Sequence, residues 1–156
     1  MTTKKTPRKT ASAAKASAQG MDAFFTRGKA NEGVELPLYL PDGTKSEHWV
    51  RIRGVDSDIF RAAEAESRRD AFRIANIESP TERAEAISAS KRRLVAALVV
   101  SWSFDRPCTL EDVEDFFLEA PQIMDAIDMA ASRRALFFAK GSSNSQPSQS
   151  TSSSST

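Results

Sequence analysis

The chain has 156 residues, the length of a single domain, and is too short for a (β/α)₈ barrel or for a dinucleotide-binding domain with a separate substrate domain. Lys and Arg total 22 against 21 Asp and Glu, but residues 1–20 hold five of the basic side chains and no acidic one, so the remainder is mildly acidic. This balance argues against a broad basic surface for nucleic acid. A single Cys and a single His exclude an intrachain disulfide and a Cys-based zinc site.

The two terminal segments have compositions typical of disorder. Residues 1–20 are basic and poor in large apolar residues, and nine of the sixteen residues in 141–156 are Ser. Neither segment has the apolar side chains that would offset the conformational entropy lost on ordering. The sequence therefore predicts one folded domain, residues 21–140, between a disordered basic tail and a disordered Ser-rich tail. It leaves open whether translation starts at Met1 or at Met21.

The folded region begins with a pattern typical of a β-hairpin, at about residues 34–53. Apolar residues occupy every second position from Val34 to Leu40, and a second alternating run follows. Between the two runs, residues 41–44 read Pro-Asp-Gly-Thr, a turn sequence in which Gly accepts a positive φ. Pro37 has no backbone N–H to donate, so the first strand is expected at an edge of the sheet.

The rest of the domain is predicted to be helical. Four helices are expected, at about residues 57–77, 79–102, 109–120 and 121–140. Asp56 or Ser57 can cap the first helix, and Ser79 and Thr109 are the expected caps of the second and third. The second helix is apolar on nearly all sides from Leu94 to Trp102, which predicts the central core helix. The expected fold class is α+β, mainly α with a small N-terminal β-hairpin, in a compact helical domain of about four helices.

Few side chains are candidates for catalysis. Cys108 and His48 could form a nucleophile–base pair, but nothing near Cys108 in the sequence supplies an oxyanion hole or an orienting carboxylate. The carboxylates fall mostly on solvated helix faces, and no Gly-rich phosphate loop is present. No apolar run approaches the roughly 18 residues that a membrane span needs. We expect no enzymatic activity, no cofactor, no metal site and no contact with a membrane.

Adjacent phenylalanines are the strongest anomaly in the composition. Neighbouring residues on a helix diverge by about 100°, so one core-facing stripe takes only one ring of a Phe-Phe pair. We expect the other ring to bind a partner protein, beside an acidic face that steers a basic client. The predicted partner-binding residues are Phe116, Phe117, Phe137, Phe138, Glu111, Glu114 and Asp115. The alternative is a thin core that takes both rings of each pair.

A series of short stretches, in a fixed order, is distributed over residues 22–140. The stretches are Phe24-Phe25-Thr26-Arg27-Gly28, Leu36-Pro37-Leu38-Tyr39, Pro41-Asp42-Gly43, His48-Trp49, Arg51-Ile52-Arg53-Gly54-Val55-Asp56, Leu94-Val95-Ala96-Ala97-Leu98, Ala120-Pro121 and Arg134-Ala135-Leu136-Phe137. Together they resemble the tail assembly chaperones of long-tailed, siphovirus-type bacteriophages. The resemblance lies in the composition and order of these short stretches, not in a catalytic motif.

The resemblance implies a small helical protein that acts in the host cytoplasm. Such a protein binds the phage tape-measure protein, keeps it soluble during tail assembly and is absent from the mature virion. A frameshifted, longer form of the chain and further copies of the chain are possible additional partners. Two alternatives stay open: a structural virion subunit of the tail or connector, and, more remotely, a nucleic-acid-binding adaptor that uses residues 1–20 with Arg51 and Arg53.

Overall fold

The computed structural model describes residues 20–139, which form five α-helices, two short 3₁₀ helices and a three-stranded antiparallel sheet. Apart from Gly20, the two predicted tails lie outside the described residues. In chain order the elements are η1 (Met21–Phe24), α1 (Arg27–Glu32), β1 (Val34–Tyr39), β2 (Lys45–Ile52), α2 (Asp58–Ala75), α3 (Pro80–Ala96), β3 (Val99–Trp102), α4 (Leu110–Glu119), α5 (Pro121–Ser132) and η2 (Arg134–Phe138). The mainly helical α+β fold with an N-terminal hairpin is confirmed, although the short α1 was not expected.

The β1–β2 hairpin has the predicted turn and the predicted edge strand. Val34 pairs with Ile52, and the chain reverses through a turn in which Gly43 has a φ of 86°. The strand order is β1-β2-β3, so β1, which contains Pro37, lies at an edge of the sheet. A missing backbone donor is tolerated there because an edge strand is paired on one side only.

The prediction of a helix from 79 to 102 is wrong over its last part. Helix α3 ends at Ala96, and Val99–Trp102 forms β3, which pairs antiparallel with β2. A short run that is apolar on all sides fits a buried strand as well as a buried helix, and the free edge of β2 decides between them by offering unpaired backbone groups. Leu98 is fully buried, as expected for the core, but it lies in the turn before β3 rather than in a helix.

The predicted final helix, 121–140, is also shorter than expected. Helix α5 ends at Ser132, and a separate 3₁₀ helix, η2, follows after Arg133 leaves the helical conformation at φ −85° and ψ 87°. This break lets Arg134 bind Asp56 and places Phe137 against Gly54. Tertiary contacts thus override a sequence that is locally compatible with a continuous helix.

Two of the three predicted helix caps form as the local sequence indicates. At the start of the remaining helix, α2, a tertiary contact supplies the cap hydrogen bond instead. The hydroxyls of Ser79 and Thr109 accept hydrogen bonds from the first turns of α3 and α4, as predicted. Ser57 is the N-cap residue of α2, but its side chain forms no cap hydrogen bond. The side-chain oxygen of Asn31 in α1 instead accepts the backbone N–H of Asp58 at 2.9 Å, which joins α1 to the start of α2.

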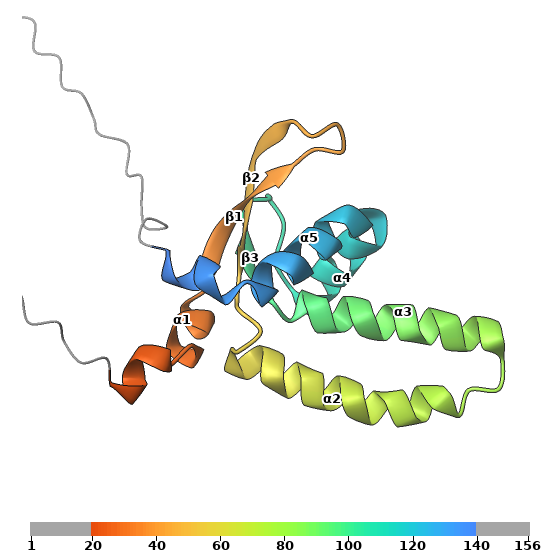
Figure 1. The fold of residues 1–156 in the computed structure, drawn as a ribbon. Helices are drawn as coiled ribbons and strands as arrows, with labels where there is room; N and C mark the ends of the chain where they lie inside the picture. The colour runs from red at the N-terminus through yellow and green to blue at the C-terminus, as the bar shows by residue number, and fades with distance from the viewer. Residues whose placement is uncertain (1–19, 140–156) are drawn as a thin grey trace, which may run out of the picture.

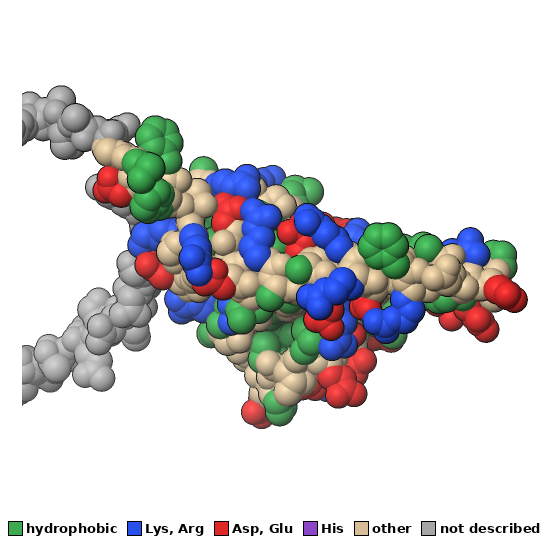
Figure 2. All heavy atoms as spheres, turned by 90° about the horizontal axis from the view of Figure 1, so that it is seen from below, with side chains coloured by type: hydrophobic (Ala, Val, Ile, Leu, Met, Phe, Trp, Pro, Cys, Tyr) green, Lys and Arg blue, Asp and Glu red, His purple; other side chains and the backbone are tan. Residues whose placement is uncertain are grey.

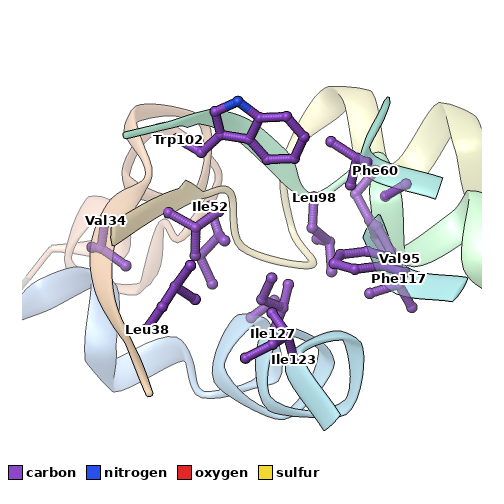
Figure 3. Packing of buried hydrophobic residues seen from close by; sticks show 14 of the residues in the cluster. Val34, Leu38, Ile52, Phe60, Val95, Leu98, Trp102, Phe117, Ile123 and Ile127 are labelled. Carbon is purple, nitrogen blue, oxygen red and sulfur yellow. The ribbon is translucent and has the colours of Figure 1, made fainter. Parts of the chain in front are cut away.

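The hydrophobic core lies between the sheet, the end of α3 and the α4–α5 pair (Figure 3). Ile52 of β2, Leu98, Phe117 of α4 and Ile127 of α5 are among its most deeply buried side chains. We call the sheet together with α4 and α5 the body. The antiparallel pair α2–α3 projects beyond the body as a long hairpin, which we call the arm (Figure 1).

Candidate protein-interaction surface

The arm contributes to the core only at its base, through Phe60 at the start of α2 and Val95 and Ala96 at the end of α3. No residue from Arg61 to Leu94 is buried, and the structure describes every residue in this range. The two helices meet through half-buried small and apolar side chains, with the Ser67 and Ser90 hydroxyls 3.3 Å apart at the contact. At the tip, the Arg83 guanidinium donates two hydrogen bonds to the backbone oxygen of Ile77, which holds the connection between the helices.

A groove of about 540 Å³ runs between α2 and α3 on one side of the arm. Its lining residues are mainly small or aliphatic: Ser67, Ala71, Ile74, Ala75, Arg83, Ile87, Ser90, Lys91 and Leu94. Ile87 is 55% exposed, although it is a large aliphatic residue on the groove wall. We call this hollow the arm groove. All of its lining residues belong to α2 or α3, and within residues 20–139 no third element contributes to the lining.

Two hollows along the arm differ in charge. The arm groove has two charged lining residues, Arg83 and Lys91, and both are basic. A smaller hollow of about 80 Å³ has Glu66, Asp70 and Arg93 among its lining residues and is therefore of mixed charge. Seen from the α2 side, basic and acidic side chains alternate along the arm with hydrophobic groups between them (Figure 2). Of these two hollows, the arm groove is the one with a mainly apolar lining and no acidic lining residue.

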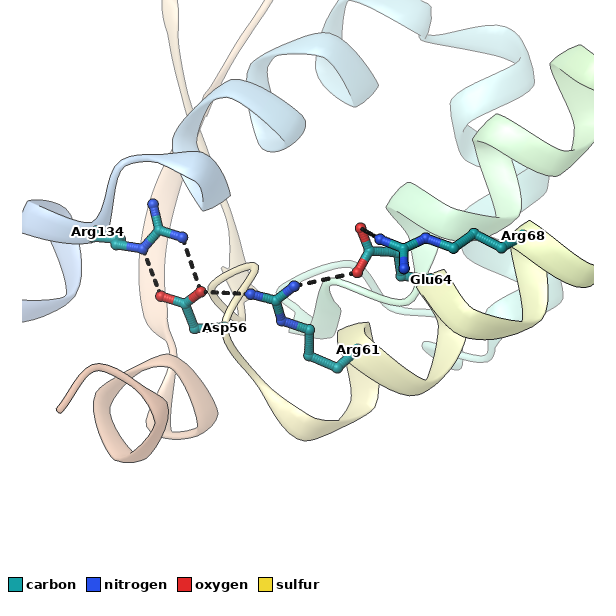
Figure 4. Close-up of polar contacts among 5 residues, drawn as sticks. All are labelled: Asp56, Arg61, Glu64, Arg68 and Arg134. Atoms are coloured by element: carbon teal, nitrogen blue, oxygen red, sulfur yellow. Dashed lines mark hydrogen bonds and ion pairs between the residues drawn. The ribbon is translucent and has the colours of Figure 1, made fainter.

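The base of the arm is held to the body by ion pairs. Asp56 accepts hydrogen bonds from Arg134 at 2.7 and 3.0 Å and from Arg61 at 3.1 Å, while Glu64 lies between Arg61 and Arg68 (Figure 4). The hydrogen bonds from Arg134 lower the pKa of Asp56 to about 2, against the opposing effect of burial. The carboxylate therefore stays charged above about pH 4, and the arm is anchored to η2.

The predicted Phe pairs have different surroundings. In the second pair, Phe137 is buried and Phe138 is 46% exposed. In the first pair, Phe117 is 1% exposed, while Phe116 is half-buried with its ring 5.9 Å from Trp102 and 5.4 Å from Phe104 between centroids. The expected split into one inner and one outer ring holds for Phe137 and Phe138, but Phe116 belongs to an aromatic cluster of the body.

The predicted acidic residues do not act as one free face. Glu111 and Asp115 are exposed on α4, whereas Glu114 pairs with Arg93 of α3 at 3.4 Å. The two Phe pairs pack against different elements, since Phe116 contacts the aromatic residues of β3 and its following loop, and Phe137 contacts Gly54 before α2. The arm groove was not predicted, because its exposure follows from the absence of a covering helix rather than from a local pattern.

The two side chains considered for catalysis lie in different surroundings. Cys108 is half-buried, and burial together with the nearby Asp112 raises the pKa of its thiol, which favours the less nucleophilic protonated form. His48 Nδ1 lies 3.1 Å from the Ser103 hydroxyl, and its ring packs at 4.5 Å from that of Phe104. Neither residue contacts the other among the hydrogen bonds and ring contacts of the described part.

Within residues 20–139, no group of three or more His, Cys, Asp or Glu residues is arranged to hold a metal ion. In the same range, no helix combines the length and the apolar character needed to cross a membrane.

Comparisons with protein-family models, with curated proteins and with solved structures found no match for this chain.

Proposed function

We propose that the protein is a non-enzymatic tail assembly chaperone of a bacteriophage, which binds the tape-measure protein and keeps it soluble in the host cytoplasm. The proposal joins the sequence resemblance described above to one structural observation. That observation is the arm, a two-helix hairpin without a buried residue between Arg61 and Leu94 and with an open, mainly apolar groove.

The arm is suited to bind an apolar helical client. A helix pair with an uncovered apolar stripe gains stability when a third element covers the stripe, because apolar surface leaves water. The arm carries charged side chains on its other surfaces, including the pairs of Arg61 and Arg68 with Glu64 and of Arg73 with Asp70. These charges oppose unspecific association of the free protein.

The proposed function is tested by co-expression with the tape-measure protein of the same phage. We expect the full chain to raise the soluble fraction of the tape-measure protein several-fold and to co-purify with it. An unrelated soluble protein, expressed at the same level, is the control. Failure to solubilise or co-purify the tape-measure protein contradicts the proposal.

A second measurement separates the chaperone from a structural virion subunit. Mass spectrometry of purified virions should find no stoichiometric amount of the chain. Its presence at tail-subunit copy number would identify a structural component instead.

A further inference from the structure

The arm groove has a chemistry that selects its occupant. We propose that it binds an amphipathic α-helix of the client in which the apolar stripe is flanked by carboxylates, with Ile87 as the apolar contact and Lys91 as the charge partner. This inference rests on the proposed function, since it names the segment of the client that the arm recognises.

The shape of the groove favours a helix. The arm groove lies between two antiparallel helices, and Ser67, Ala71 and Ser90 place small side chains along it. Small side chains let the backbone of a third helix approach closely, so that its larger residues fill the space between the two ridges. The hollow of about 540 Å³ has room for several aliphatic side chains. A third helix completes a three-helix arm in which Ile87 and Leu94 become buried.

The charges of the groove favour carboxylates on that helix. Arg83 and Lys91 are the charged lining residues, and no acidic residue is among the residues that line the groove. Lys91 has only a distant partner, since its Nζ lies 3.8 Å from Asp125 in an exposed pair. A carboxylate beside the apolar stripe of the client can therefore pair with Lys91, whereas a basic flank meets like charge.

The chain's own segments fit the groove poorly. Residues 1–20 carry five basic side chains and no acidic one, so the basic rim repels them, and residues 141–156 have no large apolar side chain to bury. Among residues 20–139, a second copy could offer α4 or α5 as an acidic helix, but the apolar stripes of both are already buried in its own core: Val113 and Phe117 of α4, and Ile123 and Ile127 of α5. A separate protein helix is therefore the occupant that the observations favour.

The test uses two designed peptides of about 18 residues, five helical turns, with leucines at the same i, i+3, i+4 and i+7 positions. One peptide has Glu beside the leucine stripe and the other has Lys. Fluorescence anisotropy with the full chain should show the Glu peptide binding about tenfold more tightly at low salt, and the difference should shrink in high salt. Equal binding of the two peptides, or binding of neither, overturns the proposal.

Charge-reversal variants locate the binding site. Lys91→Glu should weaken binding of the Glu peptide several-fold and strengthen binding of the Lys peptide. Arg69→Glu is the matched control, because Arg69 is exposed on α2 and does not line the arm groove. An equal effect of the two variants would mean that net charge, not the groove, controls binding, and would overturn the proposal.

A second pair of variants tests the apolar contact. Ile87→Glu should abolish binding of the Glu peptide. Leu118→Glu on α4 is the control and should leave binding unchanged, because Leu118 is 58% exposed and Ile87 is 55% exposed. Unchanged melting temperatures show that both variants fold. If sedimentation shows instead that wild-type copies associate and that Ile87→Glu separates them, the groove holds a second copy and the proposal is wrong.

The outcomes also separate this inference from the proposed function. If Ile87→Glu and Lys91→Glu solubilise the tape-measure protein as well as the wild type does, the groove is not the client site, but the chaperone function stands. If the wild type does not solubilise the tape-measure protein while the Glu peptide binds as expected, the chaperone function fails and the specificity of the groove stands.

Discussion

The body and the arm of this protein are both made of regular secondary structure, but they are stabilised in different ways. The body buries Ile52, Leu98, Phe117 and Ile127 in a common core, whereas the arm buries no residue from Arg61 to Leu94, a stretch that the structure describes in full. Apolar burial is the main source of folding free energy, so the body supplies most of the stability. The arm leaves large apolar side chains such as Phe72 and Ile87 exposed.

Local interactions maintain the helices of the arm. Pairs at i, i+3 and i, i+4, such as Arg61 and Arg68 with Glu64, each contribute a few tenths of a kcal/mol in exposed helices. The cap at Ser79 and the contacts of Arg83 with Ile77 stabilise the tip. Four experiments test this division between a body with a core and an arm held by local interactions.

The largest difference is expected between two phenylalanines. Phe117→Ala in the body should lower the free energy of unfolding by about 3–5 kcal/mol, because the ring is 1% exposed and its loss leaves a cavity. Phe72→Ala in the arm should change it by less than about 0.5 kcal/mol, because that ring is 78% exposed. Urea denaturation of the two variants measures both values. Similar losses would show that the arm has a core of its own.

The junction between α1, η2 and the start of the arm is closely packed around Gly54. A Cβ at Gly54 would lie 3.0 Å from the Cβ of Ala30 and 3.2 Å from the Phe137 ring, so Gly54→Ala should cost about 1–3 kcal/mol. Gly28→Ala is the control, since the added Cβ meets no atom within 4 Å beyond its chain neighbours and the backbone of its own helix, and Ala favours a helix by up to about 1 kcal/mol. Equal effects of the two substitutions on the unfolding free energy would rule out close packing at Gly54.

The ion pair at the base of the arm should make stability depend on pH. Asp56 has a pKa of about 2 in the folded protein, below its ordinary value of about 3.9, so its pairing with Arg134 stabilises the fold above about pH 4 and is lost as the pH falls toward 2. Arg134→Met should lower the melting temperature by a few degrees at pH 6 and progressively less below pH 4.

A matched arm variant serves as the control for this pH dependence. Arg68→Met removes a guanidinium from an exposed i, i+4 pair and should lower the melting temperature by less than Arg134→Met does at pH 6. An effect of Arg134→Met that stays constant from pH 6 to pH 2.5 would contradict the assigned role of Asp56.

The smallest effect is expected at the tip of the arm. Ser79→Ala removes the hydroxyl that accepts the backbone N–H of Glu82, and it should destabilise the start of α3 by about 1 kcal/mol. Hydrogen exchange should become faster at the tip while the amides of β2 stay unchanged, because the arm shares no core with them there. Ser88→Ala, an exposed position inside α3, should show no such increase. Faster exchange throughout the body would show that the two regions unfold together.

Local sequence signals predicted much of the fold. The hairpin, its turn at Gly43 and the caps at Ser79 and Thr109 were predicted correctly, because each depends on residues within a few positions of one another. The strand β3 and the break before η2 were not predicted, because they depend on β2 and on Asp56, which are distant in sequence. Of the predicted site residues, Phe138 is exposed as expected, while Phe116 packs within the body.

The sequence by itself determined the mainly helical class, the N-terminal hairpin and where α3 and α4 begin, since turn and cap chemistry is local. Only the tertiary structure decided that Val99–Trp102 becomes a strand, because the free edge of β2 offers hydrogen bonds that an isolated apolar run cannot reveal. It also decided which apolar side chains stay exposed. Burial depends on a packing neighbour. Phe137 is buried because it packs at Gly54, whereas Ile87 stays exposed because it lies on the wall of the arm groove.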